Sequence, residues 1–217
     1  MDGDYETVSG TYETESTVKG SRFIAVVQRC PDADSIREAL EGISARYPNA
    51  THYCYAAVFG GRSRGERFSD NGEPSGTAGR PILSVLRGSG LSDTICVVVR
   101  YFGGTLLGTG GLVQAYTDSA SSVLGICERS RMVYCRTYAA DLSYDIHSKL
   151  IPKLKGITLG EPECSYSDKV GCTFRVRDED AERFERMFSD ATGGTVVPRS
   201  LGNGYAEVRL WSRSSRS

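Results

Sequence analysis

Apolar positions follow strand-like and helix-like periods in turn over the first 60 residues. A β-branched apolar run over 22–29 predicts a strand. Asp32 and Asp34 are suited to cap the helix that follows, and Pro48 ends it. One face of that helix is marked by apolar residues at steps of four, three and four: Ile36, Leu40, Ile43 and Tyr47. A second strand is expected over 51–59.

The next segments alternate polar loops with apolar elements. Residues 60–72 are rich in Gly, Arg and Ser and predict an exposed loop. A helix is expected from Thr77 to about Gly88, and another over 112–126. Between them, 93–101 carries an uninterrupted apolar run, which is typical of a central strand covered on both faces.

The remaining residues predict a second domain with the order βαββαβ. This order is that of the ferredoxin-like arrangement. The predicted strands cover 132–144, 158–166, 170–176 and 195–211, and the predicted helices cover 146–154 and 178–190. The chain is therefore expected to be α+β with two domains: an acidic N-terminal tail over 1–16, a first domain over 17–134 and a ferredoxin-like domain over 135–212.

Charge favours an anion-binding surface in the first domain. The 217-residue chain has a net charge of −1, which excludes a protein that coats DNA through an overall positive charge. Residues 1–16 hold five acids and no base, whereas 17–136 hold fourteen bases and ten acids. No apolar run approaches the roughly 20 residues of a membrane span, and the acidic start is unlike a signal peptide. A cytoplasmic protein with no membrane partner is expected.

The cysteines predict reduced structural thiols. Their number is odd and no CxxC pair occurs, so neither a zinc knuckle nor a disulfide framework is expected. With only two histidines, His52 and His147, a centre of several histidines is excluded. We expect no metal and no cofactor.

Two segments carry candidate chemistry. Residues 69–81 combine three glycines with hydroxyls and acids ahead of a helix, where free backbone amides attract an anion; Asp70 or Glu73 could equally cap that helix. Residues 100–112 are glycine-rich and follow the apolar strand, at the kind of sheet edge where ligands bind. They match neither GxxxxGK[ST] nor GxGxxG, so a P-loop or Rossmann site is not expected, and the glycines could serve close packing alone.

A catalytic alternative rests on His52 and Cys54. Separated by two positions on a strand, they point to one face and could form a Cys/His pair. With Asp70 and Glu73 they would line a hydrolase or small-anion cleft. A buried histidine bonded to a backbone carbonyl explains the same pattern without catalysis.

The chain resembles the IMPACT family and its bacterial YigZ-like branch. Four stretches carry the resemblance: 19–25 (KGSRFIA), 50–56 (ATHYCYA), 69–83 and 98–116. The resemblance implies a first domain with the fold of the second domain of ribosomal protein S-five, followed by a ferredoxin-like module. Eukaryotic members regulate translation initiation and carry an extra N-terminal domain for which Phe23 lies too early, so their kinase-control role is not transferred. Leu106, Gln114 and Asn71 stand where the family pattern has lysine, arginine and aspartate.

We expect a non-catalytic regulator linked to translation that binds RNA or the ribosome, or a protein of the translation machinery, through its first domain. Arginine forks suit phosphate oxygens and aromatic rings stack on bases. An arginine-rich surface that is merely solvated explains the loop arginines equally. The candidate RNA- or anion-binding residues are Arg62, Arg64, Arg67, Thr77, Gly79, Arg80, Arg100, Tyr101, Phe102, Gly103, Gly104, Gly110 and Gly111.

Overall fold

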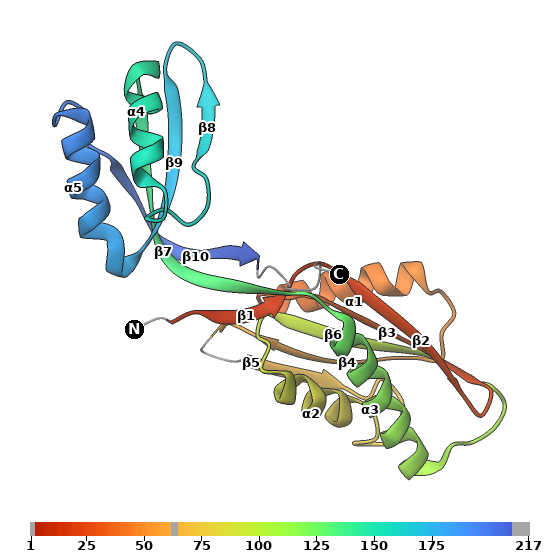
Figure 1. Ribbon diagram of the computed structural model, residues 1–217. Coiled ribbons are helices and arrows are strands. Elements are labelled where there is room, and N and C mark those ends of the chain that lie inside the picture. Colours follow the sequence, from red (N-terminus) through yellow and green to blue (C-terminus); the bar gives the residue numbers. More distant parts are fainter. Residues whose placement is uncertain (1–2, 62–64, 210–217) are drawn as a thin grey trace, which may run out of the picture. The chain divides into compact units, whose positions relative to one another are not determined.

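The computed structural model describes residues 3–61 and 65–209, and its contacts divide the chain into two compact units. Of the described residues, the first unit comprises 5–61 and 65–130, and the second comprises 131–208 together with 3–4. Both units contain helices and strands (Figure 1), which confirms the predicted α+β class with two domains. The contacts divide the chain after Ser130, so the boundary predicted between 134 and 135 lies within the long strand β7 (Arg129–Leu142).

The first unit is built on a five-stranded antiparallel sheet. Its strands follow the order β2 (Tyr12–Val18), β3 (Ser21–Arg29), β6 (Thr94–Tyr101), β4 (His52–Phe59) and β5 (Gly65–Ser69). Every residue of the central strand β6 except Tyr101 is buried, as the uninterrupted apolar run predicts.

Helices cover both faces of this sheet, so the first unit is an α/β sandwich (Figure 1). Helix α1 (Ala33–Arg46) packs on the face that includes Ile24 and Val26. Helices α2 (Gly79–Ser89) and α3 (Gly108–Ile126) pack on the face of Phe23 and Ala25. Alternate residues of β3 therefore enter two separate cores, because successive side chains of a strand point to opposite faces.

The separate acidic tail predicted for 1–16 is wrong. Strand β1 (Tyr5–Val8) places Val8 in the core of the first unit, and β2 pairs with β3 along its whole length. The acids of β2 are compensated within the fold: Glu15 forms an ion pair with Arg22 at 2.8 Å, and Glu13 with Arg46 at 2.9 Å. Composition suggested a tail because the pairing partners of these acids lie later in the sequence.

The loop predicted over 60–72 is also partly wrong. Gly65–Ser69 form the edge strand β5, which pairs with β4. An edge strand tolerates polar residues because it is hydrogen-bonded on one side only, so hydropathy could not distinguish it from a loop. Arg67 is exposed on this strand. Arg62 and Arg64 lie outside the described residues.

The second unit has the predicted βαββαβ order. After β7 come α4 (Tyr144–Leu154), β8 (Glu163–Tyr166), β9 (Val170–Arg177), a short 3₁₀ helix (Asp178–Asp180), α5 (Ala181–Thr192) and β10 (Arg199–Arg209). In its sheet β9 lies between β7 and β8, and β10 pairs with β7. Apolar residues of both helices and of β9 share one core. Among the described residues, no helix is both long and apolar enough to span a membrane.

Candidate functional site

A buried carboxylate, Glu73, joins three elements of the first unit. It lies in the turn before α2, and its side chain is 3% exposed. Glu73 Oε1 accepts a hydrogen bond from Arg100 Nη1 of β6 at 2.6 Å and another from the Tyr116 hydroxyl of α3 at 2.7 Å. His52 Nε2 of β4 lies 3.8 Å from the same oxygen. This carboxylate therefore fixes the turn against both the sheet and α3.

Arg100 is held in place on several sides. Its Nη2 donates to Ser21 Oγ at 3.2 Å, and its guanidinium lies 5.4 Å from the ring centroid of Phe23 and 5.6 Å from that of Phe102. The residue is only 5% exposed. Its Nε is buried and has no hydrogen-bond partner among the residues described. Arg100 is thus a fixed, buried cation with one unsatisfied donor, and not the exposed phosphate fork that the sequence suggested.

Asp70 caps helix α2. Its carboxylate accepts hydrogen bonds from the backbone amides of Gly76, Ala78 and Gly79 at 2.8–3.0 Å. Burial alone would raise the pKa of this carboxyl, but these three hydrogen bonds outweigh burial and hold the pKa below its ordinary value. The amides at the start of α2 therefore already bind a carboxylate, which favours the capping interpretation of 69–81 over an external anion.

Replacing Asp70 by asparagine should make the first unit less stable, by about 1 kcal/mol at neutral pH, because a charged cap of three amides is lost. The folded-state pKa of Asp70 is lowered, so its contribution is present above the unfolded pKa and disappears as pH falls through the folded value. Urea unfolding at several pH values tests this. The difference between wild type and D70N should shrink towards acid; a difference that is constant with pH would contradict it.

Cys54 is unsuited to act as a nucleophile at neutral pH. Its thiol donates to the Asp70 carbonyl at 2.9 Å and lies 3.3 Å from the Tyr116 hydroxyl. Burial raises the pKa of this thiol to about 12, whereas reactive cysteines have a lowered pKa. His52 Nδ1 contacts the Asn71 carbonyl at 2.8 Å, as the non-catalytic interpretation expects. The structure does gather His52, Cys54, Asp70 and Glu73, but it keeps the thiol protonated.

Two glycines allow the glycine-rich turn to pack directly on the β2–β3 turn. A Cβ at Gly103 would lie 1.9 Å from the carbonyl carbon of Gly20. Gly20 itself has a φ of +81°, which favours glycine. A Cβ at Gly79 would similarly lie 2.9 Å from the Ser69 backbone. Close packing therefore accounts for the glycines at 79 and 103. Gly104 has a φ of +85°, a backbone conformation that favours glycine. Gly110 and Gly111 lie in the first turn of α3.

A cavity of about 470 Å³ opens where the turn enters α3. Its wall includes His52, Glu73, Arg100 and Phe102, together with the N-cap of α3 and its first two residues, 107–109. The N-cap residue Leu107 supplies no side-chain hydrogen bond, and the first turn holds no acid. In contrast to α2, whose first amides bind Asp70, no described side chain caps the start of this helix. The positive end of its dipole therefore lies at a cavity that is also lined by Arg100 and Glu73.

The remaining candidates lie apart from this cavity. Thr77 is buried and donates to the Pro74 carbonyl at 2.7 Å. Arg80 is exposed in the first turn of α2, 6.0 Å from the ring centroid of Phe68 on β5. The Tyr101 hydroxyl donates to the Pro48 carbonyl at 3.1 Å, so this ring is engaged in the fold.

Sequence reasoning missed three residues that shape the cavity. Tyr116 and Ser21 bind Glu73 and Arg100, and Thr51 Oγ1 accepts the Phe102 amide at 3.0 Å. Their partners are 43, 79 and 51 residues away in the chain, so local patterns gave no signal for these contacts. Only the apolar period of 112–126 pointed to a buried position near Tyr116.

Comparison with known proteins places the first unit in a described domain family. Residues 19–124 match the Impact N-terminal domain. YvyE of Bacillus subtilis (strain 168), an IMPACT family member, is 36% identical over 193 residues, which is 88% of either chain. An IMPACT family member of Haemophilus influenzae is 43% identical over 192 residues, covering 86% of this chain and 92% of that protein.

Two further matches agree with these. YigZ of Escherichia coli (strain K12), also an IMPACT family member, is 40% identical over 129 residues, or 58% of this chain and 63% of that protein. A solved structure titled "Crystal structure of an hypothetical protein" superposes with a TM-score of 0.65 at 29% identity, covering 93% of this chain and 99% of its own. The similarity thus extends beyond the first unit.

Proposed function

The chain belongs to the IMPACT family, and from this premise we propose that it is a non-catalytic, cytoplasmic regulator linked to translation, which binds single-stranded RNA, free or on the ribosome, through the cavity at the start of α3. Family membership supports the regulatory role. The observation that carries the RNA proposal is the meeting of uncapped helix amides, a buried guanidinium and an exposed aromatic ring at one cavity.

The cavity has the size and chemistry for one nucleotide. About 470 Å³ lies within the range of small-ligand pockets. Phe102 is 47% exposed, so a base can stack on its ring. The uncapped amides of α3 suit a phosphate. The Arg100 guanidinium is paired with Glu73 Oε1 at 2.6 Å, so it adds donors to the cavity wall and little net charge. A base and its phosphate would thus meet different walls of one cavity.

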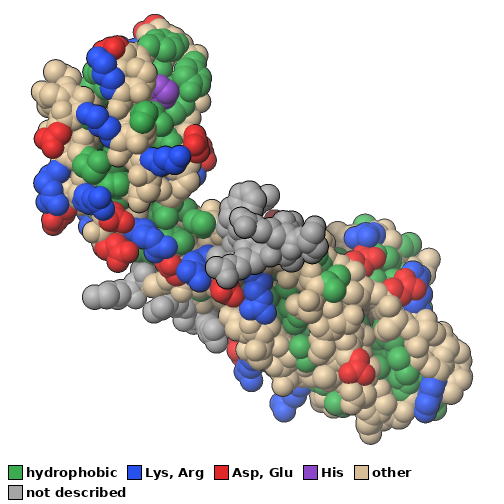
Figure 2. Space-filling view, in the orientation of Figure 1, with side chains coloured by type: hydrophobic (Ala, Val, Ile, Leu, Met, Phe, Trp, Pro, Cys, Tyr) green, Lys and Arg blue, Asp and Glu red, His purple; other side chains and the backbone are tan. Residues whose placement is uncertain are grey.

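The proposal does not rest on a broad basic surface. On the face of the first unit seen in Figure 2, Lys and Arg side chains lie apart from one another, with acids among them. Leu106, at the cavity, is 83% exposed and adds no charge. Binding is therefore expected to involve few phosphates and to depend only moderately on salt.

A hydrolase is the weaker candidate. His52 lies within 4 Å of Glu73, so a histidine–carboxylate pair is present. However, the Cys54 thiol of the cluster is buried and its pKa is raised to about 12, so it is unsuited to act as the nucleophile beside this pair. We therefore keep the RNA-binding proposal.

Replacing Thr109 by glutamate should weaken RNA binding by about tenfold while leaving the fold intact. Thr109 is exposed in the first turn of α3. A carboxylate there interacts favourably with the helix dipole, by about 0.3–1 kcal/mol, and at the same time competes with phosphate for the same amides. Fluorescence anisotropy of a labelled, unstructured oligonucleotide, repeated across a salt titration, measures the effect.

The matched control is Thr109→Gln, which has the same length without the charge and should bind nearly as wild type. If T109E and T109Q bind RNA equally well, the start of α3 is not the phosphate site. If wild type fails to bind at low salt, the RNA proposal itself is wrong.

A further inference from the structure

Three metal-ligating side chains meet in the second unit, far from the cavity in sequence and in a separate core. His147 comes from α4, Cys164 from β8 and Cys172 from β9. Cys164 and Cys172 are register partners across the β8–β9 pair. Their sulfurs lie 2.7 Å apart, and Cys164 Sγ lies 3.7 Å from His147 Nε2. All three ligand atoms lie within 4.8 Å of one another.

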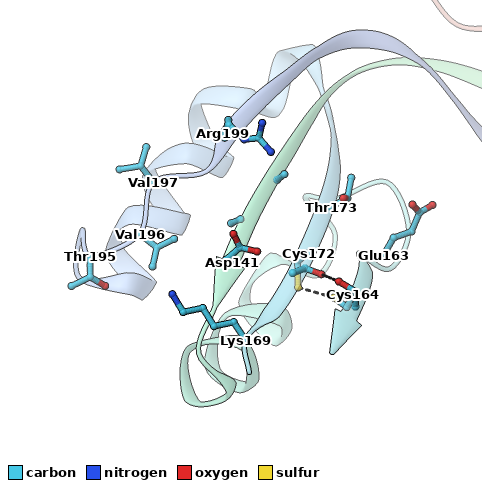
Figure 3. Close-up of a pocket in the computed structure, with 14 residues that line it drawn as sticks. Asp141, Glu163, Cys164, Lys169, Cys172, Thr173, Thr195, Val196, Val197 and Arg199 are labelled. Atoms are coloured by element: carbon cyan, nitrogen blue, oxygen red, sulfur yellow. Dashed lines mark hydrogen bonds between the residues drawn. The ribbon is translucent and has the colours of Figure 1, made fainter. Parts of the chain in front are cut away.

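Figure 3 shows Cys164 and Cys172 on neighbouring strands, with their side chains directed toward each other. Cys172 is 2% exposed and belongs to the core of the second unit, while Cys164 and His147 are half-buried at its edge. The ring of His147 also makes an edge contact with Tyr166, with 5.9 Å between ring centroids. The cluster is thus partly enclosed by protein and reachable from solvent.

We propose that His147, Cys164 and Cys172 bind a single zinc ion. Two thiolates and an imidazole are donors that Zn²⁺ prefers, and three protein ligands with a water in the fourth position complete a tetrahedron. Hard cations such as Mg²⁺ or Ca²⁺ favour oxygen ligands instead.

The distances need only small adjustment for this ion. With Zn–S near 2.3 Å and Zn–N near 2.0 Å, ligand atoms of a tetrahedral site are about 3.5–3.8 Å apart. The His147–Cys164 separation already has this value. The two sulfurs must separate by about 1 Å, which side-chain rotation supplies, since these are free thiols.

Binding changes the protonation of the cluster without any redox step. Burial, together with the neighbouring Cys164, raises the pKa of the Cys172 thiol to about 12. Each thiol that ligates zinc releases its proton to solvent, and His147 binds as the neutral imidazole. Affinity is therefore expected to rise with pH.

The ion would stabilise a short edge strand of the unit. Strand β8 is four residues long and lies at the end of the sheet path. A zinc ion held by α4, β8 and β9 joins this edge strand to a helix, and it stabilises the folded unit by an amount that grows with the logarithm of the free metal concentration once that exceeds Kd.

Cobalt(II), which replaces zinc in such sites and reports thiolate ligands by charge-transfer absorption, provides the test. Full-length protein, kept reduced, is titrated with Co²⁺, and bound zinc is counted by elemental analysis after dialysis. Wild type should bind one ion per chain with a thiolate band. Cys164→Ser should lose the stoichiometric ion, and His147→Gln should bind at least about tenfold more weakly, because even outer-shell partners are worth 10–100-fold. Cys127→Ser, which removes a half-buried thiol of the first unit, should bind as wild type.

Two results would overturn the proposal. One is a reduced wild-type protein that binds no cobalt at micromolar concentration, whether or not peptide mapping of a separate, unreduced sample finds a Cys164–Cys172 disulfide. The other is metal binding that C164S and H147Q leave undiminished. Circular dichroism of each variant shows that a lost ion does not reflect a lost fold.

Discussion

Replacing Glu73 by glutamine is expected to lower the free energy of unfolding of the first unit by about 3–5 kcal/mol, the cost of leaving one partner of a buried ion pair uncompensated. Arg100 is 5% exposed, and Glu73 is the only carboxylate that it contacts among the described residues. The Tyr116 hydroxyl donates a hydrogen bond to the same Glu73 oxygen. Glutamine keeps the shape but not the charge. Urea unfolding followed by circular dichroism measures the change.

Glu15→Gln is the matched control, because it removes the same charge from an exposed pair with Arg22 and should change stability little. Adding Arg100→Met to E73Q removes both charges and should recover much of the loss, since a buried pair replaced by apolar groups is often neutral. A loss in E73Q no greater than in E15Q would mean that the buried pair does not hold this turn.

Adding one methyl group at Gly103 is expected to destabilise the first unit by about 2–3 kcal/mol, at the upper end of overpacking costs. The new Cβ would lie 1.9 Å from the carbonyl carbon of Gly20 and 2.0 Å from its oxygen. Both are backbone atoms, so no side-chain rotation relieves the contact, and the two turns must move apart. Because Phe102 precedes this glycine, the cavity should change shape as well. Thermal and urea unfolding of G103A measure the effect.

Gly110→Ala provides a control of opposite sign. A Cβ at Gly110 meets nothing within 4 Å, and the residue lies in the first turn of α3, so alanine should raise stability by about 0.5–1 kcal/mol through helix propensity. If G103A is as stable as G110A, the two turns do not pack as described.

Local periodicity predicted most of the elements. The run over 93–101 is apolar on both faces because β6 lies between two helical layers, and the 3.6-residue period of 33–46 is visible because α1 buries one face only. Asp32 was identifiable as a cap from its position, and it does accept the Ser35 amide at 2.8 Å. These features depend on neighbours within a few residues.

Edge strands and long-range pairs were not predicted because both depend on partners that are distant in the sequence. The polar strands β2 and β5 are held by backbone hydrogen bonds to β3 and β4, so the hydropathy of their side chains does not mark them as strands. The partners of Glu73 are 27 and 43 residues away. Glu73 lies next to Arg100 because of the order of the strands in the sheet, and the sequence pattern did not specify that order.

Geometry that the sequence pattern did not specify decided the arrangement at both sites. Segment 69–81 was identifiable as a helix start, but which acid caps it depended on geometry, and Asp70 makes the cap while Glu73 faces Arg100. Cys164 and Cys172 lack CxxC spacing, and only the register of β8 and β9 places them side by side. A hairpin prediction with its register would have found that pair.

The most direct test of RNA binding at the start of α3 is ultraviolet crosslinking of the full-length protein to an unstructured oligonucleotide, followed by peptide mapping. Phe102 and the peptide around the start of α3 should carry the crosslinked nucleotide, and Thr109→Glu should remove it. Phe68, 42% exposed on β5, serves as the internal comparison because it lies outside the residues that line the cavity. Crosslinks that map to Phe68 or to the second unit, with none near Phe102, would contradict the account.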